Sequence, residues 1–193
     1  FKIAIDKVIS LILLILLFPF FSLLSLLILI ILKKPIFFLH ERLGKNEKKF
    51  LVIKFKTLSN YTVSKNTIKK RENKFGNILR RYSIDELPQL INILKGDMSL
   101  VGPRPLEKKY LSKYNNIQKK RHKVLPGITG LAQINGRNRL SWKKKFQYDI
   151  FYVRKKNLCI DLVILLKTIV YIFKINDVSD ENHFNKEPFD GTN

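Results

Sequence analysis

The chain has 193 residues, of which 37 are Lys or Arg and 15 are Asp or Glu, so its formal net charge is +22 at neutral pH. Hydrophobic residues make up 46% of it, which excludes an intrinsically disordered basic tail. Its single cysteine, Cys159, excludes a disulfide-stapled secreted module. A charge this positive predicts a polyanionic neighbour, and composition alone leaves open nucleic acid, an anionic membrane face and phosphorylated substrates.

The first feature along the chain is an uncharged, apolar run over residues 8–32. A helix of this length can cross a bilayer core and has no polar side, so we expect it to insert into a membrane. Pro19 lies near the middle of the run, and basic residues flank both ends: Lys2, Lys7, Lys33, Lys34 and Arg42. Because basic flanks stay on the cytoplasmic side, a helix–break–helix that enters and leaves on one face explains both observations. A kinked spanning helix is the alternative, since membrane helices tolerate proline.

Beyond residue 34 the hydrophobic pattern predicts an α/β fold that is mostly α-helical with a small β element. The helix expected over residues 158–174 has one apolar face, which is typical either of an amphipathic helix at a membrane interface or of an ordinary core helix. The tail over 176–193 is polar and is expected to be poorly anchored. The other expected elements are strands over 36–39 and 50–55 joined by a turn at Gly44, a mobile polar loop over 59–73, helices over 87–94, 107–119 and 142–153, and an extended piece over 99–101.

One acidic pair, Asp85 and Glu86, stands out inside this basic chain. A structural interpretation exists, because Ser83 and Glu86 have the spacing of a capping box. Pro88 argues against a helix that begins so early, since its missing N–H would cost an intrahelical hydrogen bond. We therefore expect the helix to begin at Asp85 or later and to leave both carboxylates at its N-terminal end.

These carboxylates are expected to lie among Lys54, Arg80 and Arg81, which would keep them ionised. An ionised aspartate can act as a nucleophile, and a carboxylate can bind Mg²⁺ together with substrate phosphates. From residue chemistry alone, a catalytic role and a purely structural role for the pair both stay open.

Two arginines are candidates for binding phosphate. Pro103 and Pro105 restrict the backbone around Arg104, so its guanidinium has little conformational freedom left to lose. The planar fork of arginine also suits a phosphate group. Arg137 follows a glycine and is similar but less constrained. At both positions the structural alternative is a plain loop with a surface arginine.

Five segments carry a resemblance to a known family: residues 54–58 (KFKTL), 83–90 (SIDELPQL), 95–105 (KGDMSLVGPRP), 121–130 (RHKVLPGITG) and 132–138 (AQINGRN). Together they resemble the bacterial sugar transferase family, the monotopic phosphoglycosyl transferases, in their minimal PglC-like form, over nearly the whole chain and in order. The sequence departs from the family pattern at Phe18, where Ser often precedes the proline and would supply a hydroxyl, at Lys56, where Arg is usual, and at Leu131, where Trp is usual.

The resemblance implies transfer of a sugar-1-phosphate from a UDP-sugar to undecaprenyl (polyprenyl) phosphate with release of UMP, the first membrane step of glycan assembly. It makes Asp85 the nucleophile, through a phosphosugar–aspartyl intermediate, and gives Glu86 a helper role. Mg²⁺ is the implied cofactor, with Asp85 as its leading ligand. The residues expected to bind substrate are Lys54, Arg80, Arg104 and Arg137.

The resemblance also implies three regions: a re-entrant membrane helix over residues 1–34, a cytosolic catalytic domain with interfacial amphipathic helices over 35–175, and a polar tail over 176–193. It places the protein at the bacterial inner membrane, with the catalytic domain on the cytoplasmic face, among membrane lipids and glycosyltransferases of the same pathway. The expected donor is N-acetylated, with UDP-N,N′-diacetylbacillosamine favoured by the resemblance of the tail. UDP-glucose or UDP-galactose is the alternative.

Two other classes of function are alternatives to this prediction. A membrane-tethered nucleic-acid-binding protein would use the lysine excess, but the chain lacks aromatic stacking positions interleaved with its cations, so we expect no nucleic acid among the partners. A catalytically silent scaffold for a glycan-assembly complex is disfavoured by the intact pair of Asp85 and Glu86.

Overall fold

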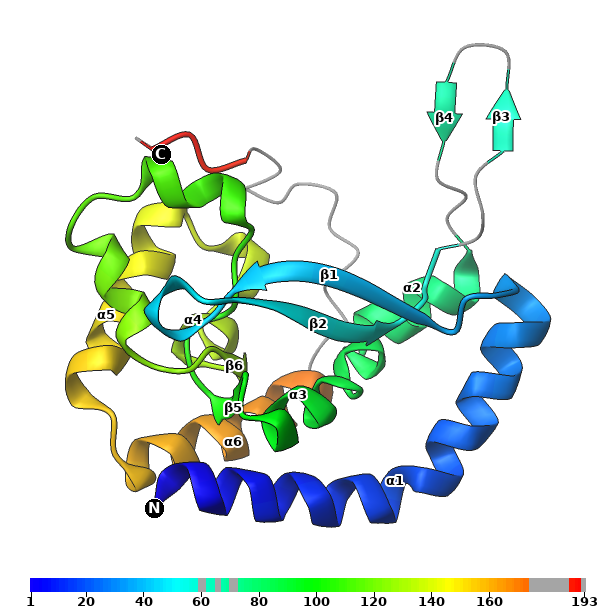
Figure 1. The fold of residues 1–193 in the computed structure, drawn as a ribbon, viewed down its shortest axis with the longest axis horizontal. Coiled ribbons are helices and arrows are strands. Elements are labelled where there is room, and N and C mark those ends of the chain that lie inside the picture. The colour runs from blue at the N-terminus through cyan, green and yellow to red at the C-terminus, as the bar shows by residue number, and fades with distance from the viewer. Residues whose placement is uncertain (59–61, 65–66, 70–72, 174–187, 192–193) are drawn as a thin grey trace.

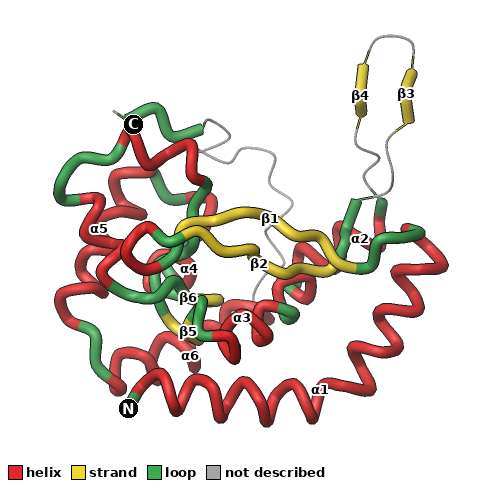
Figure 2. Tube along the Cα trace, in the orientation of Figure 1, coloured by secondary structure: helices red, strands yellow, loops and turns green. Residues whose placement is uncertain are grey.

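The structure, a computed structural model, describes residues 1–58, 62–64, 67–69, 73–173 and 188–191. Its helices are α1 (Lys2–Leu32), α2 (Lys74–Arg81), α3 (Gln89–Lys95), α4 (Leu131–Ile134), α5 (Trp142–Lys155) and α6 (Leu158–Phe173). Its strands are β1 (Phe37–Leu43), β2 (Lys49–Phe55), β3 (Thr62–Ser64), β4 (Thr67–Lys69), β5 (Ser99–Val101) and β6 (Gly127–Thr129). The mostly helical fold with small β elements is therefore confirmed (Figure 2). Of the four helices predicted beyond residue 34, three are confirmed as α3, α5 and α6.

Helix α1 is the one helix in the described ranges that is long and apolar enough to cross a membrane. It changes direction partway along its length (Figure 1), and it contains Pro19, which removes a backbone hydrogen bond and bends helices. The hydroxyl of Ser22 donates to the carbonyl of Phe18 at 3.0 Å. A hydroxyl therefore lies beside the proline although residue 18 is not serine.

Both parts of α1 pack against the rest of the protein. The first part lies along α3, where Leu13 and Leu17 are partly buried against the main core. The second part buries a separate cluster made of Leu24, Ile28, Leu32, Phe55 and Leu79. The remaining side chains of α1 are largely exposed apolar groups, as suits a helix with lipid around it.

Two small sheets bring distant parts of the chain together. Strands β1 and β2 form the predicted antiparallel hairpin, longer than expected, with Phe38 opposite Lys54. Strands β5 and β6 pair in parallel, and β5 ends directly before Gly102. A Cβ on Gly102 would lie 2.4 Å from the carbonyl oxygen of Leu125, so the close approach of the two segments requires glycine.

The region expected to be a polar loop contains a short antiparallel hairpin, β3–β4 (Figure 1), while residues 59–61, 65–66 and 70–72 lie outside the described ranges. Helix α2, which the sequence did not predict, follows directly. The side chain of Asn73 caps it by accepting from the N–H of Phe75 at 2.8 Å. Gly76 weakens the helical pattern, and it is required because a Cβ there would lie 1.8 Å from the carbonyl oxygen of Thr57.

The prediction of one helix over residues 107–119 is wrong. Two 3₁₀ helices, Lys108–Lys113 and Gln118–Lys123, take its place. Between them the side chain of Asn115 accepts hydrogen bonds from the backbone N–H groups two and three residues further on, at 3.0 and 2.9 Å. This local bonding competes with the helical pattern and interrupts it.

The C-terminal residues 188–191 are anchored, which corrects the expectation of a poorly anchored tail. Phe189 is fully buried, and Lys113 Nζ donates to its carbonyl at 3.0 Å. Its ring lies 5.1 Å from that of Phe146, in an aromatic cluster that also contains Tyr110, Tyr114 and Trp142. The rest of the predicted tail, residues 176–187 and 192–193, lies outside the described ranges.

Candidate active site

The acidic pair lies in a 3₁₀ turn, Ile84–Glu86, that precedes α3. Ser83 has a left-handed backbone with φ 57°, and its side chain makes no capping bond, so the capping-box interpretation is wrong. The helix begins at Gln89, so both carboxylates precede it as expected, and Gly96 ends it as a left-handed C-cap with φ 87°. Asp85 and Glu86 are buried, with 7% and 9% of their surfaces exposed.

Glu86 binds the cations of the site. Arg104 makes two hydrogen bonds to it, Nη2 to Oε1 at 2.6 Å and Nη1 to Oε2 at 3.2 Å. Lys54 Nζ donates to Oε1 at 2.6 Å. Burial opposes ionisation of Glu86, but the charges of Arg104 and Lys54 outweigh it and hold its pKa well below the usual range. Glu86 is therefore an anion that fixes two cations next to Asp85.

The pKa of Asp85 is shifted in the opposite direction to that of Glu86. Burial first, and the negative charge of Glu86 second, raise its pKa from 3.8 to about 6, although Lys54 and Arg104 act against them. Within the described ranges no ion pair of the Asp85 carboxylate is found, because both cations are bound to Glu86. The neighbouring cations thus keep Glu86 ionised as expected, but for Asp85 they only partly offset burial.

Arg80, which is predicted to bind substrate, forms no ion pair with Asp85 or Glu86 among the described residues. Its guanidinium donates to Thr57 Oγ1 at 3.4 Å and to Asn77 Oδ1. The cations that act on the pair are Lys54 and Arg104 instead, which come from β2 and from the loop after β5.

Arg137 joins the site from the segment after α4. Its guanidinium lies 5.2 Å from the centroid of the Tyr171 ring of α6. Burial lowers its pKa, the charge of Arg104 lowers it further, and those of Glu86 and Asp85 raise it. These four charged groups therefore share one electrostatic neighbourhood, while the role of Arg137 stays a prediction.

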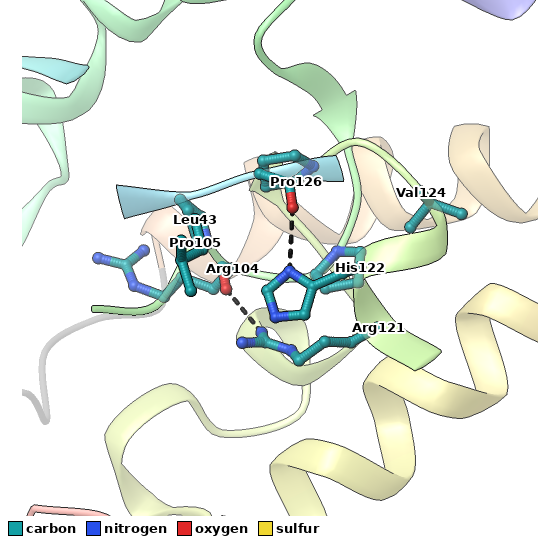
Figure 3. Close-up of a pocket in the computed structure, with 9 residues that line it drawn as sticks. Leu43, Arg104, Pro105, Arg121, His122, Val124 and Pro126 are labelled. Atoms are coloured by element: carbon teal, nitrogen blue, oxygen red, sulfur yellow. Dashed lines mark hydrogen bonds between the residues drawn. The ribbon is translucent and has the colours of Figure 1, made fainter. Parts of the chain in front are cut away.

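A buried ion pair supports the loop that carries Arg104. Arg121, which is only 3% exposed, donates from Nη2 to the backbone carbonyl of Arg104 at 2.6 Å (Figure 3). The same guanidinium contacts Asp149 Oδ2 at 2.8 Å. In the same pocket His122 Nδ1 lies 3.0 Å from the carbonyl oxygen of Gly44. These contacts fix the loop that carries Arg104. The two prolines of this loop already restrict its backbone, as the sequence predicts.

Asn92, buried inside the protein, aligns the acidic pair with Lys54. Its Oδ1 accepts from the N–H of Ile53 at 3.0 Å, and its Nδ2 donates to the carbonyl of Leu51 at 2.7 Å. Asn92 lies on α3, so these two bonds join that helix to β2 directly before Lys54. The sequence carries no motif signal for this role.

Lys56, which stands where the family pattern has arginine, is buried at the end of α1. Its Nζ donates to the carbonyls of Leu32 at 2.9 Å, Lys33 at 3.2 Å and Lys34 at 3.1 Å. The ammonium thereby satisfies carbonyls that a helix leaves unpaired at its C-terminal end. This residue supports the C-terminal end of α1.

The carboxylates of the site decide whether it can hold the implied Mg²⁺. No group of three or more metal-binding side chains occurs in the part of the chain that the structure describes. Both oxygens of Glu86 accept from cations, which leaves Asp85 as the available carboxylate of the pair. Mg²⁺ is commonly held by one or two carboxylates plus substrate phosphates, so these residues fit a cation that binds together with a phosphorylated substrate.

Comparison with known proteins shows the family to which the chain belongs. The family profile described as bacterial sugar transferase matches residues 1–175. The chain is 46% identical to the uncharacterized sugar transferase EpsL of Bacillus subtilis (strain 168) over 161 residues, 82% of this chain and 80% of that protein. It is 38% identical over 152 residues to the UDP-glucose:undecaprenyl-phosphate glucose-1-phosphate transferase of Xanthomonas campestris pv. campestris. It is 34% identical over 157 residues to the UDP-galactose-lipid carrier transferase of Erwinia amylovora.

The last two matches cover 72% and 70% of this chain but only 31% and 32% of those proteins, so the chain spans about a third of their length. The family match nevertheless runs from α1 through the acidic pair to the end of α6. The chain therefore belongs to the bacterial sugar transferase family. It is an enzyme of the transferase class.

Proposed function

We propose that the chain is a phosphoglycosyl transferase that moves a sugar-1-phosphate from a UDP-sugar to undecaprenyl phosphate and releases UMP. The observation that carries the proposal is the buried carboxylate of Asp85, which forms no ion pair among the described residues and lies beside an anion, Glu86, that holds Arg104 and Lys54. Two relatives whose names state such a glucose-1-phosphate transfer support it. The reaction would be the first membrane step of glycan assembly and would supply glycosyltransferases of the same pathway.

The first half-reaction joins Asp85 to the sugar phosphate. A carboxylate oxygen attacks the phosphorus that bears the sugar and forms an acyl phosphate. The bond between this phosphorus and the bridging oxygen breaks, and its electron pair leaves with UMP. In the second half-reaction an oxygen of undecaprenyl phosphate attacks the same phosphorus, a diphosphate bond forms, and Asp85 leaves as a carboxylate.

The surrounding cations stabilise the charge that the phosphate oxygens carry during both steps. The Arg104 side chain is 48% exposed although it binds Glu86, so its remaining N–H groups can face a substrate phosphate. Lys54 and Arg137 add positive charge on other sides. We further propose that Asp85 would hold a Mg²⁺ ion that arrives with the phosphorylated donor, and the ion would supply positive charge to offset that of the departing UMP.

The relatives bear on the identity of the sugar. Their names state glucose and galactose, which favours UDP-glucose or UDP-galactose as the donor. The N-acetylated donor UDP-N,N′-diacetylbacillosamine stays a proposal that rests on sequence resemblance. All three donors belong in one assay.

We propose that α1 enters and leaves the cytoplasmic face of the inner membrane. At its start, Lys2 Nζ contacts Asp161 Oδ2 of α6 at 2.7 Å. At its end, Lys56 binds the carbonyl of Leu32. A spanning helix would separate its two ends by a hydrocarbon core of about 30 Å, whereas here both ends contact one domain. Single cysteines placed at each end, in a Cys159→Ser background, should both react with an impermeant maleimide only from the cytoplasmic side.

The reaction is tested by UMP release from the three donors with Mg²⁺, with and without undecaprenyl phosphate. We expect one equivalent of UMP without the lipid, continuous turnover with it, and neither in Asp85→Asn. Glu41→Gln, a half-exposed acid on β1, is the matched control and should behave as the wild type. Full turnover by Asp85→Asn would overturn the assignment of the nucleophile. No UMP from any donor, with DNA or RNA binding that weakens steeply with salt, would favour the nucleic-acid alternative.

A further inference from the structure

A second concave site lies between α4, α5 and α6, separate from the acidic pair. It is a groove of about 600 Å³, within the range of about 300–1,000 Å³ that is usual for ligand pockets. Its walls are mainly apolar and include Ile134 of α4, Phe151 of α5 and Val163 of α6. Lys167 is its one charged lining residue among those that the structure describes. An apolar groove with one cation suits an amphiphile that carries a negative group.

The groove is connected to the acidic site through α4 and α6. Helix α4 begins after Gly130, where a Cβ would lie 2.2 Å from the carbonyl oxygen of Gly102, in the segment that leads to Arg104. The segment after α4 carries Arg137, whose guanidinium lies over the ring of Tyr171. Tyr171 follows Lys167 on α6 by four residues, which is about one helical turn. Lys167 of the groove is thus one helical turn from the residue that Arg137 contacts, and Arg137 shares the electrostatic neighbourhood of Asp85.

The groove also adjoins a surface suited to lipid. On α6 a row of apolar side chains is more than half exposed: Leu162, Leu166, Ile169 and Val170. The start of the apolar helix α1 is bound to the same helix through Lys2 and Asp161. Large exposed apolar surfaces on neighbouring helices mark a membrane-facing side. A hydrocarbon chain could enter the groove directly from the bilayer.

We infer that this groove binds the isoprene units nearest the phosphate of the polyprenyl phosphate acceptor, with Lys167 and Arg137 guiding the phosphate towards Asp85. The inference rests on the proposed function and adds to it the place where the acceptor binds. An apolar wall that leads to cations matches a hydrocarbon chain that ends in a phosphate monoester. A bilayer phospholipid carries its phosphate between two organic groups and matches the arrangement less well.

The first test uses Cys159, which is exposed, lines the groove and is the single cysteine of the chain. The full-length Asp85→Asn variant in nanodiscs is treated with a maleimide, so no turnover is needed. Undecaprenyl phosphate should abolish labelling at saturation, whereas equal amounts of undecaprenol or phosphatidylglycerol should leave most of it. Unchanged labelling with undecaprenyl phosphate, or equal protection by phosphatidylglycerol, would overturn the inference.

The second test compares two substitutions on α6. Val163→Trp fills the groove, whereas Leu162→Trp places the same side chain one residue away, outside the lining. Val163→Trp should raise the KM for undecaprenyl phosphate by about tenfold or more. Leu162→Trp should leave that KM unchanged, and both variants should keep the UMP burst that needs no acceptor. Equal KM values for the two variants would contradict the inference.

The two tests separate the inference from the proposed function. If the reaction is wrongly assigned, the UMP burst is absent in every variant and in the wild type. Protection of Cys159 does not depend on that burst. A normal burst with no protection and no change in KM means that the acceptor binds elsewhere.

Discussion

The carboxylates of Asp85 and Glu86 follow one another in the chain, yet only that of Glu86 is paired with Arg104 and Lys54. The two cations neutralise one anion and stay close to the other. Asp85 is consequently buried beside a negative charge and has a pKa of about 6. A carboxylate that is ionised near neutral pH but not tied into an ion pair retains its nucleophilicity.

The raised pKa of Asp85 predicts how the reaction depends on pH. The nucleophile must be deprotonated, so the rate of the UMP burst should be flat above about pH 7 and should fall about tenfold per unit below about pH 6. Single-turnover kinetics at low donor concentration report this group in the free enzyme. A rate that stays constant down to about pH 4.5 would show that the group that limits the rate has an ordinary carboxylate pKa.

The same shift predicts a stability effect of opposite sign to the activity effect. The folded pKa of Asp85 lies above the unfolded value of 3.8, so stability is lost as pH rises from about 4 to about 6, by about 3 kcal/mol in total. Asp85→Asn should therefore raise the unfolding temperature relative to the wild type clearly more at pH 8 than at pH 4.5. Thermal unfolding in nanodiscs at both pH values checks this. A stability difference that is the same at both would refute it.

Glu86 should matter for rate and for the pKa of its neighbour. Glu86→Gln removes the anion that holds Arg104 and Lys54, and we expect a loss of about 10² in the rate of UMP release. Because the charge of Glu86 helps to raise the pKa of Asp85, the acid limb of the pH profile should also move to lower pH. Burst kinetics as a function of pH measure both effects.

The control for that experiment is Glu107→Gln, which removes an acid paired with Arg42 and Lys109 outside the site. Its pH profile should match that of the wild type. An acid limb of Glu86→Gln that stays in place would mean that burial alone raises the pKa of Asp85.

The fold was predictable where the local pattern was strong. Helices α5 and α6 have long apolar periodicities, and the β1–β2 hairpin has apolar runs on both sides of a turn at Gly44, so all three were found. Helix α2 was missed because Gly76 weakens its pattern, and that glycine is required by contact with the distant Thr57. The helix over 107–119 was overpredicted because a side chain, Asn115, interrupts it. Tertiary packing and side-chain hydrogen bonding therefore determine the structures of these two segments.

The site was predictable as a set of residues but not as a geometry. The adjacent acids and the proline-flanked Arg104 are visible in the sequence, because their residue types are unusual in their context. The pairing of Arg104 and Lys54 with Glu86 could not be predicted, since these residues lie 18 and 32 positions from Glu86 and meet it only in the folded chain. Supporting residues such as Asn92 and Arg121 look like ordinary surface residues until their burial is known.

The buried pair of Arg121 and Asp149 should support both stability and the position of Arg104. Asp149→Asn leaves the guanidinium of Arg121 buried without its counter-ion, and breaking such a pair costs about 3–5 kcal/mol. Because Arg121 also binds the carbonyl of Arg104, we expect a raised donor KM at temperatures where the variant is still folded. Thermal unfolding and donor kinetics are the measurements.

A double-substitution cycle distinguishes an energetic coupling between Arg121 and Asp149 from a simple loss of packing. Arg121→Met with Asp149→Leu removes both charges together, so the double variant should be more stable than Asp149→Asn alone. It should nevertheless keep the raised donor KM, since the hydrogen bond to the Arg104 carbonyl is still missing. Stability losses that simply add, with a normal KM, would mean that this pair neither acts as a unit nor positions Arg104.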